Sequence, residues 1–368
     1  MNILISTLVN PDFNNGLGKY IKYLINSLQE IDSNHHFFII VNLELSNKID
    51  IYNHKFKKIV VDIPHHPRVF MRPVYFFWQH SFFKSLLKKN MIDVFHSPNP
   101  VPIFSTFGTP YVVTIHDVAE YSIQRFSPFR QKLRIWATES SAKLSKEIIT
   151  VSKYSQSEIV KKLNRESKNV HITYPGLTLN PEFDDKIEFS KPYFLHVGGS
   201  RPNKNVRALI SAFRGIKKKD IELYIVGNTQ GIMVDQREKK KLEKEGIYLK
   251  GLVSNEELVT YYKNAIALVY PSLYEGFGLP ILEAMACGIP VITSNCTSMP
   301  EVGGEAVHYV DPYSIESIRV GMEKILTDED YRQDLIRKGL KRYKKFSWEE
   351  AARKTIEVYE MAKRGSFP

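Results

Sequence analysis

The chain is poor in cysteine. Its 368 residues include only Cys287 and Cys296, which lie close together in the sequence. Secreted folds held by disulfides use more cysteines, and a Cys-rich zinc site needs more thiolates than two. We therefore expect a cytoplasmic protein without a cysteine-based metal site.

A long apolar run is also missing. The N-terminal stretch MNILISTLV meets Pro11 soon afterwards and lacks the basic leader of a secretory signal peptide. A membrane-spanning helix needs about 18 consecutive apolar residues, and no other window reaches that length without charge. The sequence predicts no transmembrane segment.

What the chain has is an ordinary globular composition with excess positive charge. Hydrophobic residues make up 43% and charged residues 25%, and the formal net charge is +11. The length suits two domains of about 150 residues each. The charge favours nucleic acid, an acidic membrane surface or phosphorylated ligands. No nucleic-acid-binding motif appears, so we expect no nucleic-acid partner.

Short apolar runs alternate with amphipathic helical patterns along the whole chain, which predicts βαβ units and mostly parallel sheets. The predicted strands cover residues 2–7, 37–41, 58–62, 93–96, 111–115, 147–151, 193–197, 221–226, 247–250, 265–270 and 290–293. Residues 174–192 have three prolines and little periodicity. The predicted organisation is an acceptor-binding domain over 1–175, a linker over 176–191, a nucleotide-binding domain over 192–347, and a final helix over 348–368.

The most informative segment is EGFGLPILEAMACGIPVITSN, residues 275–295, which follows a predicted strand. Ligands of parallel sheets bind at the carboxyl ends of strands. Gly276 and Gly278 let a ligand approach the backbone, and Pro280 suits the first turn of a helix, whose free N–H groups favour a phosphate. The alternative is an acidic loop with a solvated helix glutamate.

The glutamates of this segment carry a family resemblance. Glu275 and Glu283, with seven residues between them, resemble the paired-glutamate motif of retaining glycosyltransferase family 4, which has the GT-B fold. The resemblance implies that Glu275 contacts hydroxyls of a donor sugar and that Glu283 binds the ribose of its nucleotide. It also places the backbone of Phe277, Gly278 and Leu279 beside the phosphates and the sugar.

A basic loop, VGGSRPNKN over residues 197–205, follows the first predicted strand of the second domain. Its glycines, including Gly199, and its two cations make a good diphosphate site, since arginine offers a planar fork and lysine a mobile charge. Arg201 and Lys204 match the family's basic pair, which neutralises the leaving diphosphate. An exposed basic turn is the alternative. Asn205 stands where many members have glycine, which affects the expected loop shape.

A glycine-containing loop precedes the first predicted helix, with Gly16 and Gly18 in the sequence NNGLGK. The dinucleotide fingerprint wants a third glycine where Ile21 stands, so a nicotinamide site is not expected. In the family such a loop lies over the donor diphosphate. A simple turn is the alternative.

Two histidines end predicted strands of the first domain. His116 and Asp117 resemble a histidine–aspartate pair of the family, whose histidine contacts the donor sugar near the reacting centre. Asp117 is a candidate for orienting that ring. His96 is a candidate for the acceptor side, with a core histidine as an equal alternative.

Residues 68–90 combine basic and aromatic side chains. On a helical wheel Trp78 and Phe82 lie on one apolar face, and Phe83 and Leu87 lie roughly opposite. A helix that is apolar on both sides is buried or meets a second apolar phase. Both a buried helix and peripheral contact with an anionic membrane stay open. Residues 125–134 form a second basic and aromatic stretch.

The sequence lacks the motif that would indicate a metal site. No Asp-x-Asp motif follows an apolar strand, and the acidic cluster at 328–330 falls between predicted helices, so a Mg²⁺-held diphosphate is not indicated. We expect neither a metal nor a cofactor. By resemblance, the reaction is a front-face substitution that retains the anomeric configuration.

The resemblance covers essentially the whole chain and implies two Rossmann-like domains with parallel sheets facing a central cleft. The segment from Phe346 onward looks like the family's ending, a helix that packs back on the first domain. The predicted function is a hexosyltransferase of surface-polysaccharide synthesis that uses GDP-mannose, or else a UDP-hexose, with a glycan or lipid-linked acceptor. The alternatives are a sugar-nucleotide 2-epimerase of similar fold and a catalytically silent partner protein.

Overall fold

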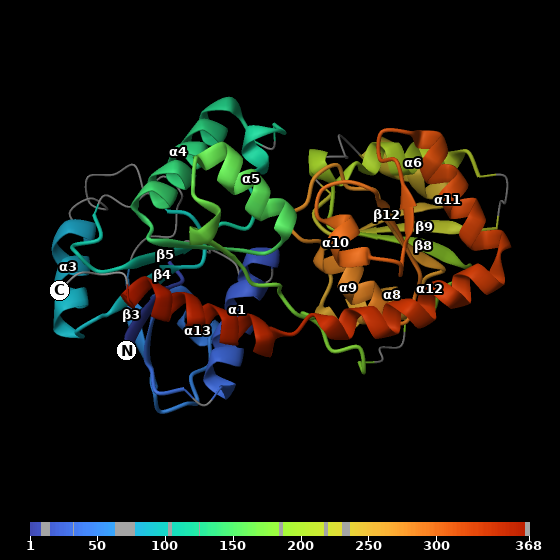
Figure 1. The fold of residues 1–368 in the computed structure, drawn as a ribbon. Helices are drawn as coiled ribbons and strands as arrows, with labels where there is room; N and C mark the ends of the chain where they lie inside the picture. The colour runs from blue at the N-terminus through green and yellow to red at the C-terminus, as the bar shows by residue number, and fades with distance from the viewer. Residues whose placement is uncertain are drawn as a thin grey trace. The chain divides into compact units, whose positions relative to one another are not determined.

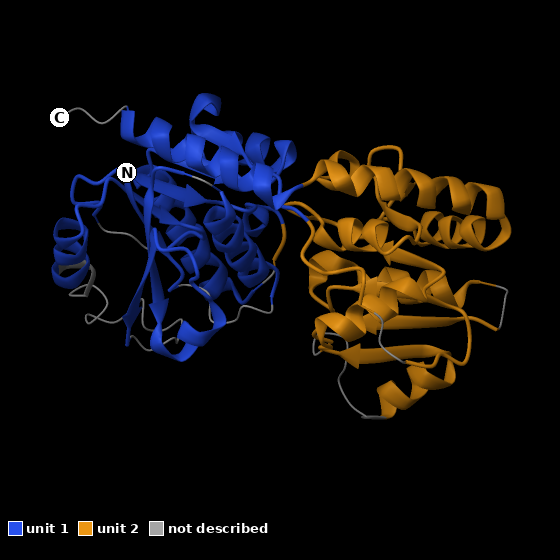
Figure 2. Cartoon of the chain, turned by 90° about the horizontal axis from the view of Figure 1, so that it is seen from below, with its two compact units in different colours: residues 1–122, 126–176, 347–368 blue, residues 123–125, 177–346 orange. Residues whose placement is uncertain are grey.

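The fold is described from a computed structural model. It covers residues 1–8, 15–31, 33–62, 78–101, 105–124, 126–183, 187–216, 220–229 and 236–364, with the backbone alone at 78–80 and 236. The chain forms two compact units (Figure 2). Unit 1 comprises residues 1–122, 126–176 and 347–368, and unit 2 comprises residues 123–125 and 177–346. Residues 177–191 of the predicted linker thus belong to unit 2.

Unit 1 is a seven-stranded parallel sheet with helices on both faces. The strand order is β3-β2-β1-β4-β5-β6-β7. In Figure 1, α4 and α5 lie on one side of this sheet, and α1 and α13 lie on the other. The strands are β1 (Asn2–Ser6), β2 (His36–Asn42), β3 (Phe56–Val61), β4 (Val94–Ser97), β5 (Tyr111–Thr114), β6 (Glu147–Thr150) and β7 (Val170–Ile172). The helices are α1 (Gly16–Glu30), α3 (Lys84–Lys89), α4 (Pro128–Leu144), α5 (Lys153–Leu163) and α13 (Trp348–Arg364), with short turns η1 (Leu43–Lys48), η3 (Trp78–Phe83), η4 (Ala119–Tyr121) and η5 (Ser167–Asn169).

Unit 2 is a six-stranded parallel sheet of the same construction. The strand order is β10-β9-β8-β11-β12-β13. The strands are β8 (Tyr193–Val197), β9 (Glu222–Val226), β10 (Ile247–Gly251), β11 (Ala267–Tyr270), β12 (Val291–Ser294) and β13 (His308–Val310). The helices are α6 (Val206–Arg214), α7 (Gln236–Lys244), α8 (Asn255–Lys263), α9 (Leu279–Ala286), α10 (Met299–Gly303), α11 (Ile315–Thr327) and α12 (Glu329–Arg342), with turns η6 (Pro202–Lys204) and η7 (Tyr343–Lys345).

The strand order fixes where a ligand is expected in unit 2. The chain builds outward from β8 in both directions, with β9 on one side and β11 on the other. Such a reversal of strand order leaves a crevice at the carboxyl ends of the two strands, where ligands of open parallel sheets bind. The loops after β8 and β11 meet at this point, and they are the basic loop and the glutamate loop.

Every strand that the sequence predicts is present, and no end is shifted by more than two residues. Strands β7 and β13 were missed. Each has three residues of which two are only half-buried, so neither produces the continuous apolar run of a strand covered on both faces.

The final helix α13 packs on α1 within unit 1, as predicted (Figure 1). The ring of Trp348 stacks on Tyr23 with centroids 5.7 Å apart and meets the edge of Tyr20 at 5.5 Å. Among the described residues, no helix is long and apolar enough to cross a bilayer.

Candidate functional site

The basic loop after β8 is shaped by two glycines. Gly198 has φ +126°, and a Cβ there would lie 3.0 Å from Cε of Lys204. Gly199 has φ +72°, and a Cβ there would lie 2.3 Å from the carbonyl oxygen of Asn228. The close approach of the Asn228 backbone therefore already requires glycine at position 199, and the positive φ favours glycine at position 198. The predicted contact of Gly199 with a ligand stays a prediction.

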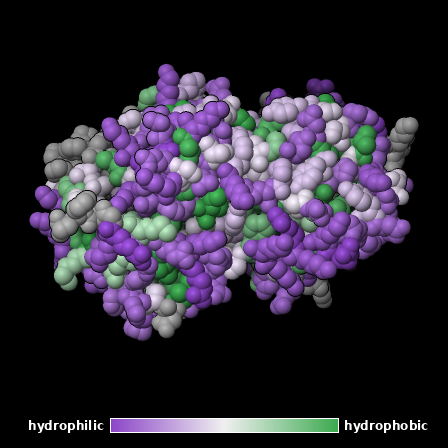
Figure 3. Space-filling model, viewed as in Figure 1, coloured by the Kyte–Doolittle hydropathy of each residue, from purple (hydrophilic) through white to green (hydrophobic). Residues whose placement is uncertain are grey.

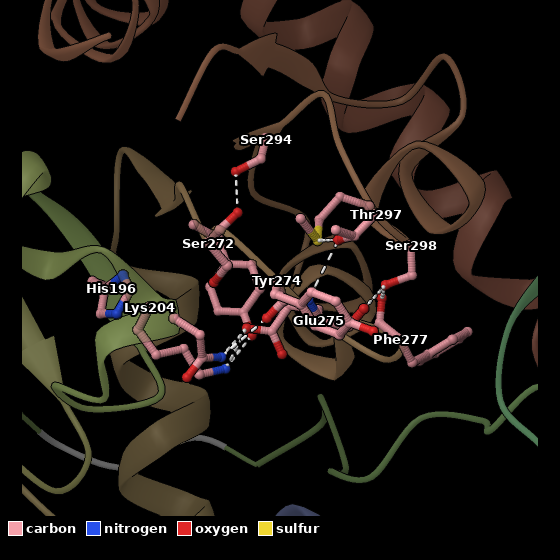
Figure 4. A network of polar contacts seen from close by, with 12 residues as sticks. His196, Lys204, Ser272, Tyr274, Glu275, Phe277, Ser294, Thr297 and Ser298 are labelled. Atoms are coloured by element: carbon pink, nitrogen blue, oxygen red, sulfur yellow. Dashed lines mark hydrogen bonds and ion pairs between the residues drawn. The ribbon is translucent and has the colours of Figure 1, made fainter. Parts of the chain in front are cut away.

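Lys204 and Glu275 form an ion pair that joins the two loops (Figure 4). Lys204 Nζ lies 2.8 Å from Glu275 Oε1 and 2.5 Å from the hydroxyl of Tyr270. Both charged side chains are only slightly exposed, at 14% and 13%. Burial, and then the nearby charge of Glu275, raise the pKa of Tyr270 well above its ordinary value, so its hydroxyl keeps its proton. A cation and a carboxylate thus lie together at the predicted ligand position.

Asn203, which also lies in the basic loop, hydrogen-bonds to Glu275 of this ion pair. Its Nδ2 donates to the carbonyl of Tyr274 at 3.0 Å and to Glu275 Oε1 at 3.3 Å, and its backbone carbonyl accepts from Leu273 N at 2.8 Å. The side chain is 2% exposed. Sequence reasoning missed this residue, although its place between the two predicted cations was a signal.

The rest of the basic loop differs in exposure and conformation. Arg201 is exposed and immediately precedes η6. Asn205 adopts the left-handed conformation with φ +57°, and its Nδ2 donates to the carbonyl of Pro312 at 2.6 Å. Asparagine is one of the few residues besides glycine that tolerates this region. The loop therefore keeps a glycine-like shape at the position where the sequence departs from the family.

The glutamate loop is held by the segment that follows β12. Thr297 Oγ1 accepts from the backbone N–H of Glu275 at 3.3 Å, and Ser298 Oγ donates to the carbonyls of Glu275 and Phe277 at 3.0 and 2.8 Å (Figure 4). Gly278 has φ +113° and directly precedes α9, which begins one residue before the predicted Pro280. Neither hydroxyl residue was predicted from the sequence, where their place after a strand end was the available signal.

Glu283 lies within α9 and is 4% exposed. Its Oε1 accepts from the hydroxyl of Thr178 at 2.6 Å and its Oε2 accepts from the hydroxyl of Tyr262 at 2.8 Å. The solvated glutamate, which was the alternative, is therefore wrong. Neither hydroxyl partner was predicted.

In unit 1, His116 is a half-buried ring held by Pro98 and Tyr20. Its Nε2 lies 3.0 Å from the carbonyl oxygen of Pro98, and Tyr20 packs edge-on at 4.5 Å between ring centroids. A carbonyl only accepts, so Nε2 carries the proton. Burial lowers the pKa of His116 below its ordinary value. The neutral ring then presents Nδ1 as an acceptor, which suits the predicted contact with a sugar hydroxyl.

Asp117 caps the turn that follows. Its Oδ1 accepts from the backbone N–H of Ala119 at 2.9 Å, at the start of η4. Its charge raises the pKa of His116 slightly against the larger effect of burial. The ring of His116 is hydrogen-bonded to Pro98, and the orienting role of Asp117 stays a prediction.

His96 is a core histidine and not a surface residue. It is fully buried, its Nδ1 lies 2.7 Å from the hydroxyl of Tyr359 and its Nε2 lies 2.9 Å from Oγ1 of Thr114. Both ring nitrogens are thus used inside unit 1. This corrects the acceptor-side candidate, because a ring without exposure has no surface for an acceptor.

The N-terminal glycine loop is described from Asn15 onward, and residues 9–14 lie outside the described part of the chain. Asn15 caps α1, because its side chain accepts from the backbone N–H of Gly18 at 2.9 Å. A Cβ at Gly16 would meet nothing within 4 Å. Packing against the described residues therefore gives no reason for glycine at position 16, and the predicted ligand contacts of both glycines stay predictions.

The basic and aromatic stretch is described from residue 78 onward, so its first part, 68–77, lies outside the described residues. Leu86, Leu87 and Phe83 are buried, whereas Phe82 is 43% exposed. Of the two predicted apolar faces, one therefore packs in the core of unit 1, and Phe82 on the other meets solvent.

Both cysteines are free. Within the described ranges, no group of three or more His, Cys, Asp or Glu side chains is arranged to hold a metal ion.

Two α/β units, each built on a parallel sheet, are typical of the GT-B fold. Solved structures share this fold. Sucrose-phosphate synthase from Thermosynechococcus elongatus superposes with a TM-score of 0.77 at 20% identity, covering 99% of this chain and 100% of that one. WaaG, a glycosyltransferase involved in lipopolysaccharide biosynthesis, gives 0.70 at 15% identity, covering 98% and 99%. The predicted GT-B fold is confirmed.

Sequence comparison gives the family. Residues 14–180 match the model of Glycosyltransferase Family 4, and residues 181–342 match that of Glycosyl transferases group 1. O-antigen chain mannosyltransferase B of Escherichia coli is 31% identical over 290 residues, 73% of this chain and 74% of that protein. The chain belongs to glycosyltransferase family 4.

Two further mannosyltransferases match shorter parts of the chain. O-antigen chain mannosyltransferase RfbU of Salmonella typhimurium is 32% identical over 215 residues, 58% of this chain and 60% of that protein. Serotype-specific mannosyltransferase WbdA of Escherichia coli is 28% identical over 247 residues, 65% of this chain but only 30% of that protein.

Proposed function

We propose that this glycosyltransferase moves mannose from GDP-mannose to a glycan or lipid-linked acceptor in surface-polysaccharide synthesis, with retention of configuration and without a metal ion. The relatives named above are mannosyltransferases, and two of them act on O-antigen chains by name. A UDP-hexose is the second donor to test.

The observation that carries the proposal is the pair of Lys204 and Glu275. A sugar diphosphate brings negative charge and several hydroxyls to one place. A lysine nearby attracts the diphosphate, and a carboxylate accepts hydrogen bonds from the sugar. Glu283, one turn into α9, is the proposed acceptor for the ribose hydroxyls.

Charge development explains the proposed metal independence. As the bond between the anomeric carbon and the diphosphate breaks, negative charge grows on the leaving group. Lys204 and Arg201 are the proposed positive partners for that charge. The same bond rupture leaves an oxocarbenium-like sugar. The acceptor hydroxyl attacks it from the face of the departing diphosphate and gives its proton to the diphosphate oxygen that leaves.

The test is a donor screen on the purified protein. Thermal shift and nucleotide release are measured with GDP- and UDP-sugars, for the protein and for Glu283→Ala. GDP-mannose is expected to stabilise the protein, and the substitution is expected to abolish that stabilisation. Proton NMR of the product determines its anomeric configuration. Transfer rates with and without a metal chelator test the metal independence. Binding of no sugar nucleotide overturns the proposal, and release of an altered free sugar without acceptor favours the epimerase alternative.

We also propose peripheral contact with an anionic membrane through α4. The face of the molecule seen in Figure 3 is mostly hydrophilic, yet α4 exposes Phe129 at 66% and Trp136 at 43%. These residues are seven apart, so they lie on one face of the helix with exposed Lys132 between them. Exposed aromatics beside cations suit an anionic lipid surface. Co-sedimentation with vesicles of phosphatidylcholine, with and without phosphatidylglycerol, tests this, and equal absence from both pellets overturns it.

A further inference from the structure

The carboxylate of Glu283 is held from two directions by neutral hydroxyl groups. Thr178 donates to Oε1 at 2.6 Å and Tyr262 donates to Oε2 at 2.8 Å. A carboxylate accepts through both of its oxygens, and one donor on each oxygen fixes its plane. A vicinal diol needs this kind of oriented carboxylate.

Both donors are rigid. Tyr262 is fully buried on α8, and burial followed by the charge of Glu283 raises its pKa well above the ordinary value, so the phenol stays a donor. Thr178 is also fully buried, and its branched Cβ restricts χ1. Neither side chain has room to leave the carboxylate without disturbing its neighbours.

Thr178 has a second significance because of its place in the chain. Gly176 is the last residue of the second segment of unit 1, and Leu177 begins the main segment of unit 2. Further along the same segment, the carbonyl of Phe183 accepts from Nζ of Lys263, on α8, at 2.8 Å. The connection is therefore anchored to α8 at one point and to the Glu283 carboxylate at another.

Building on the proposed function, in which Glu283 binds ribose, we infer that Thr178 and Tyr262 are positioning residues for nucleotide recognition. They orient the Glu283 carboxylate toward the two ribose hydroxyls of the donor. Through Thr178, the segment that leaves unit 1 becomes part of the nucleotide site.

The experiment compares GDP with 2′,3′-dideoxy-GDP by calorimetry, on the full chain and on Thr178→Val and Tyr262→Phe. Each substitution removes a hydroxyl and keeps the shape. The unmodified protein is expected to prefer GDP by about tenfold or more, and each variant is expected to lose about tenfold in affinity for GDP alone. Thr178→Ser restores the hydroxyl and is expected to restore the preference. In transfer assays the donor KM rises while kcat changes little, because ribose contacts are made equally in the ground and transition states.

A matched control separates positioning from stability. Tyr193→Phe also removes a buried phenol hydroxyl from unit 2, one that donates to the carbonyl of Tyr261 at 2.8 Å and not to Glu283. It is expected to lower the melting temperature without changing the preference for GDP.

The outcomes distinguish the proposed ribose site from the positioning roles of Thr178 and Tyr262. If the unmodified protein binds both nucleotides equally, or if Glu283→Ala keeps the preference, the proposed ribose site is wrong. If Glu283→Ala loses the preference while Thr178→Val and Tyr262→Phe keep it, the ribose site stands and the positioning inference is overturned.

Discussion

Lys204 Nζ lies 2.8 Å from Oε1 of Glu275, across 71 residues of sequence. The contact joins the loop after β8 to the loop after β11, at the point where the strand order of unit 2 reverses. Because both side chains are mostly withdrawn from solvent, removal of one partner leaves the other charge poorly compensated.

Lys204→Met is therefore expected to reduce kcat/KM for transfer by about 10²- to 10³-fold, since it removes a positive charge aimed at the leaving diphosphate. Initial rates with the donor found in the screen measure this. Lys239→Met, which removes an exposed lysine on α7, is the control and is expected to leave the rate unchanged. A Lys204→Met enzyme with nearly the rate of the unmodified protein contradicts the proposed role.

Asn205 gives a prediction about loop conformation. Asn205→Gly and Asn205→Ala both lose the hydrogen bond to Pro312, but only alanine must adopt φ +57° with a Cβ. The alanine variant is expected to be less stable than the glycine variant by about 1 kcal/mol. Urea unfolding of the two variants measures the difference. Equal stability would show that the left-handed conformation is not required.

Two buried histidines predict acid sensitivity. Burial lowers the pKa of His96 to about 3 and that of His196 to about 4, below their ordinary 6.5. Below pH 6.5 these histidines are protonated in the unfolded chain but stay neutral in the folded chain. The free energy of unfolding therefore falls as the pH falls. Each histidine contributes a slope approaching about 1.4 kcal/mol per pH unit between its two pKa values.

His96→Gln removes one of these groups and is expected to reduce that slope between pH 6 and pH 4 by about 1.4 kcal/mol per unit. Urea unfolding across this range measures the slope. His54→Gln, at an exposed position, is the control. An unchanged slope in His96→Gln contradicts the assignment of the acid sensitivity to burial of this ring.

Gly176 meets the start of α13. A Cβ there would lie 2.5 Å from the backbone nitrogen of Trp348 and 2.7 Å from its Cδ1. Backbone must shift to accept it, so Gly176→Ala is expected to destabilise the protein by about 1–3 kcal/mol. Thermal unfolding compares it with Gly16→Ala, where a Cβ would meet nothing within 4 Å. Similar stability for both variants would contradict the close contact with Trp348.

The membrane proposal predicts a loss of vesicle binding in Phe129→Ser and Trp136→Ser. Each substitution removes an exposed apolar side chain from α4, and the double variant is expected to bind anionic vesicles at least about tenfold less tightly. A blue shift of tryptophan fluorescence on addition of vesicles, lost in Trp136→Ser, gives an independent reading. Tyr313→Ser, an exposed aromatic of unit 2, is the control. Unchanged vesicle binding in the double variant would contradict a membrane contact through α4.

The sequence predicted the fold well because parallel strands covered on both faces are continuous apolar runs. It predicted the chemistry of unit 2 for a similar reason. Glycines, cations and glutamates placed directly after strands are local patterns, and parallel topology brings such loops to one edge of a sheet. These patterns depend on residues that are close together in the chain.

Only the tertiary structure decided which side chains meet. His96 and His116 are both histidines near strand ends, yet Tyr359, 263 residues away, completes the hydrogen bonds of His96 in the core. The Glu283 carboxylate likewise takes one donor from Thr178, 105 residues earlier, and another from α8. The sequence by itself determined the two α/β domains, the family and the candidate loops. The partners of each buried polar group came from packing, because a hydrogen bond depends on distance in space and leaves no periodic trace along the chain.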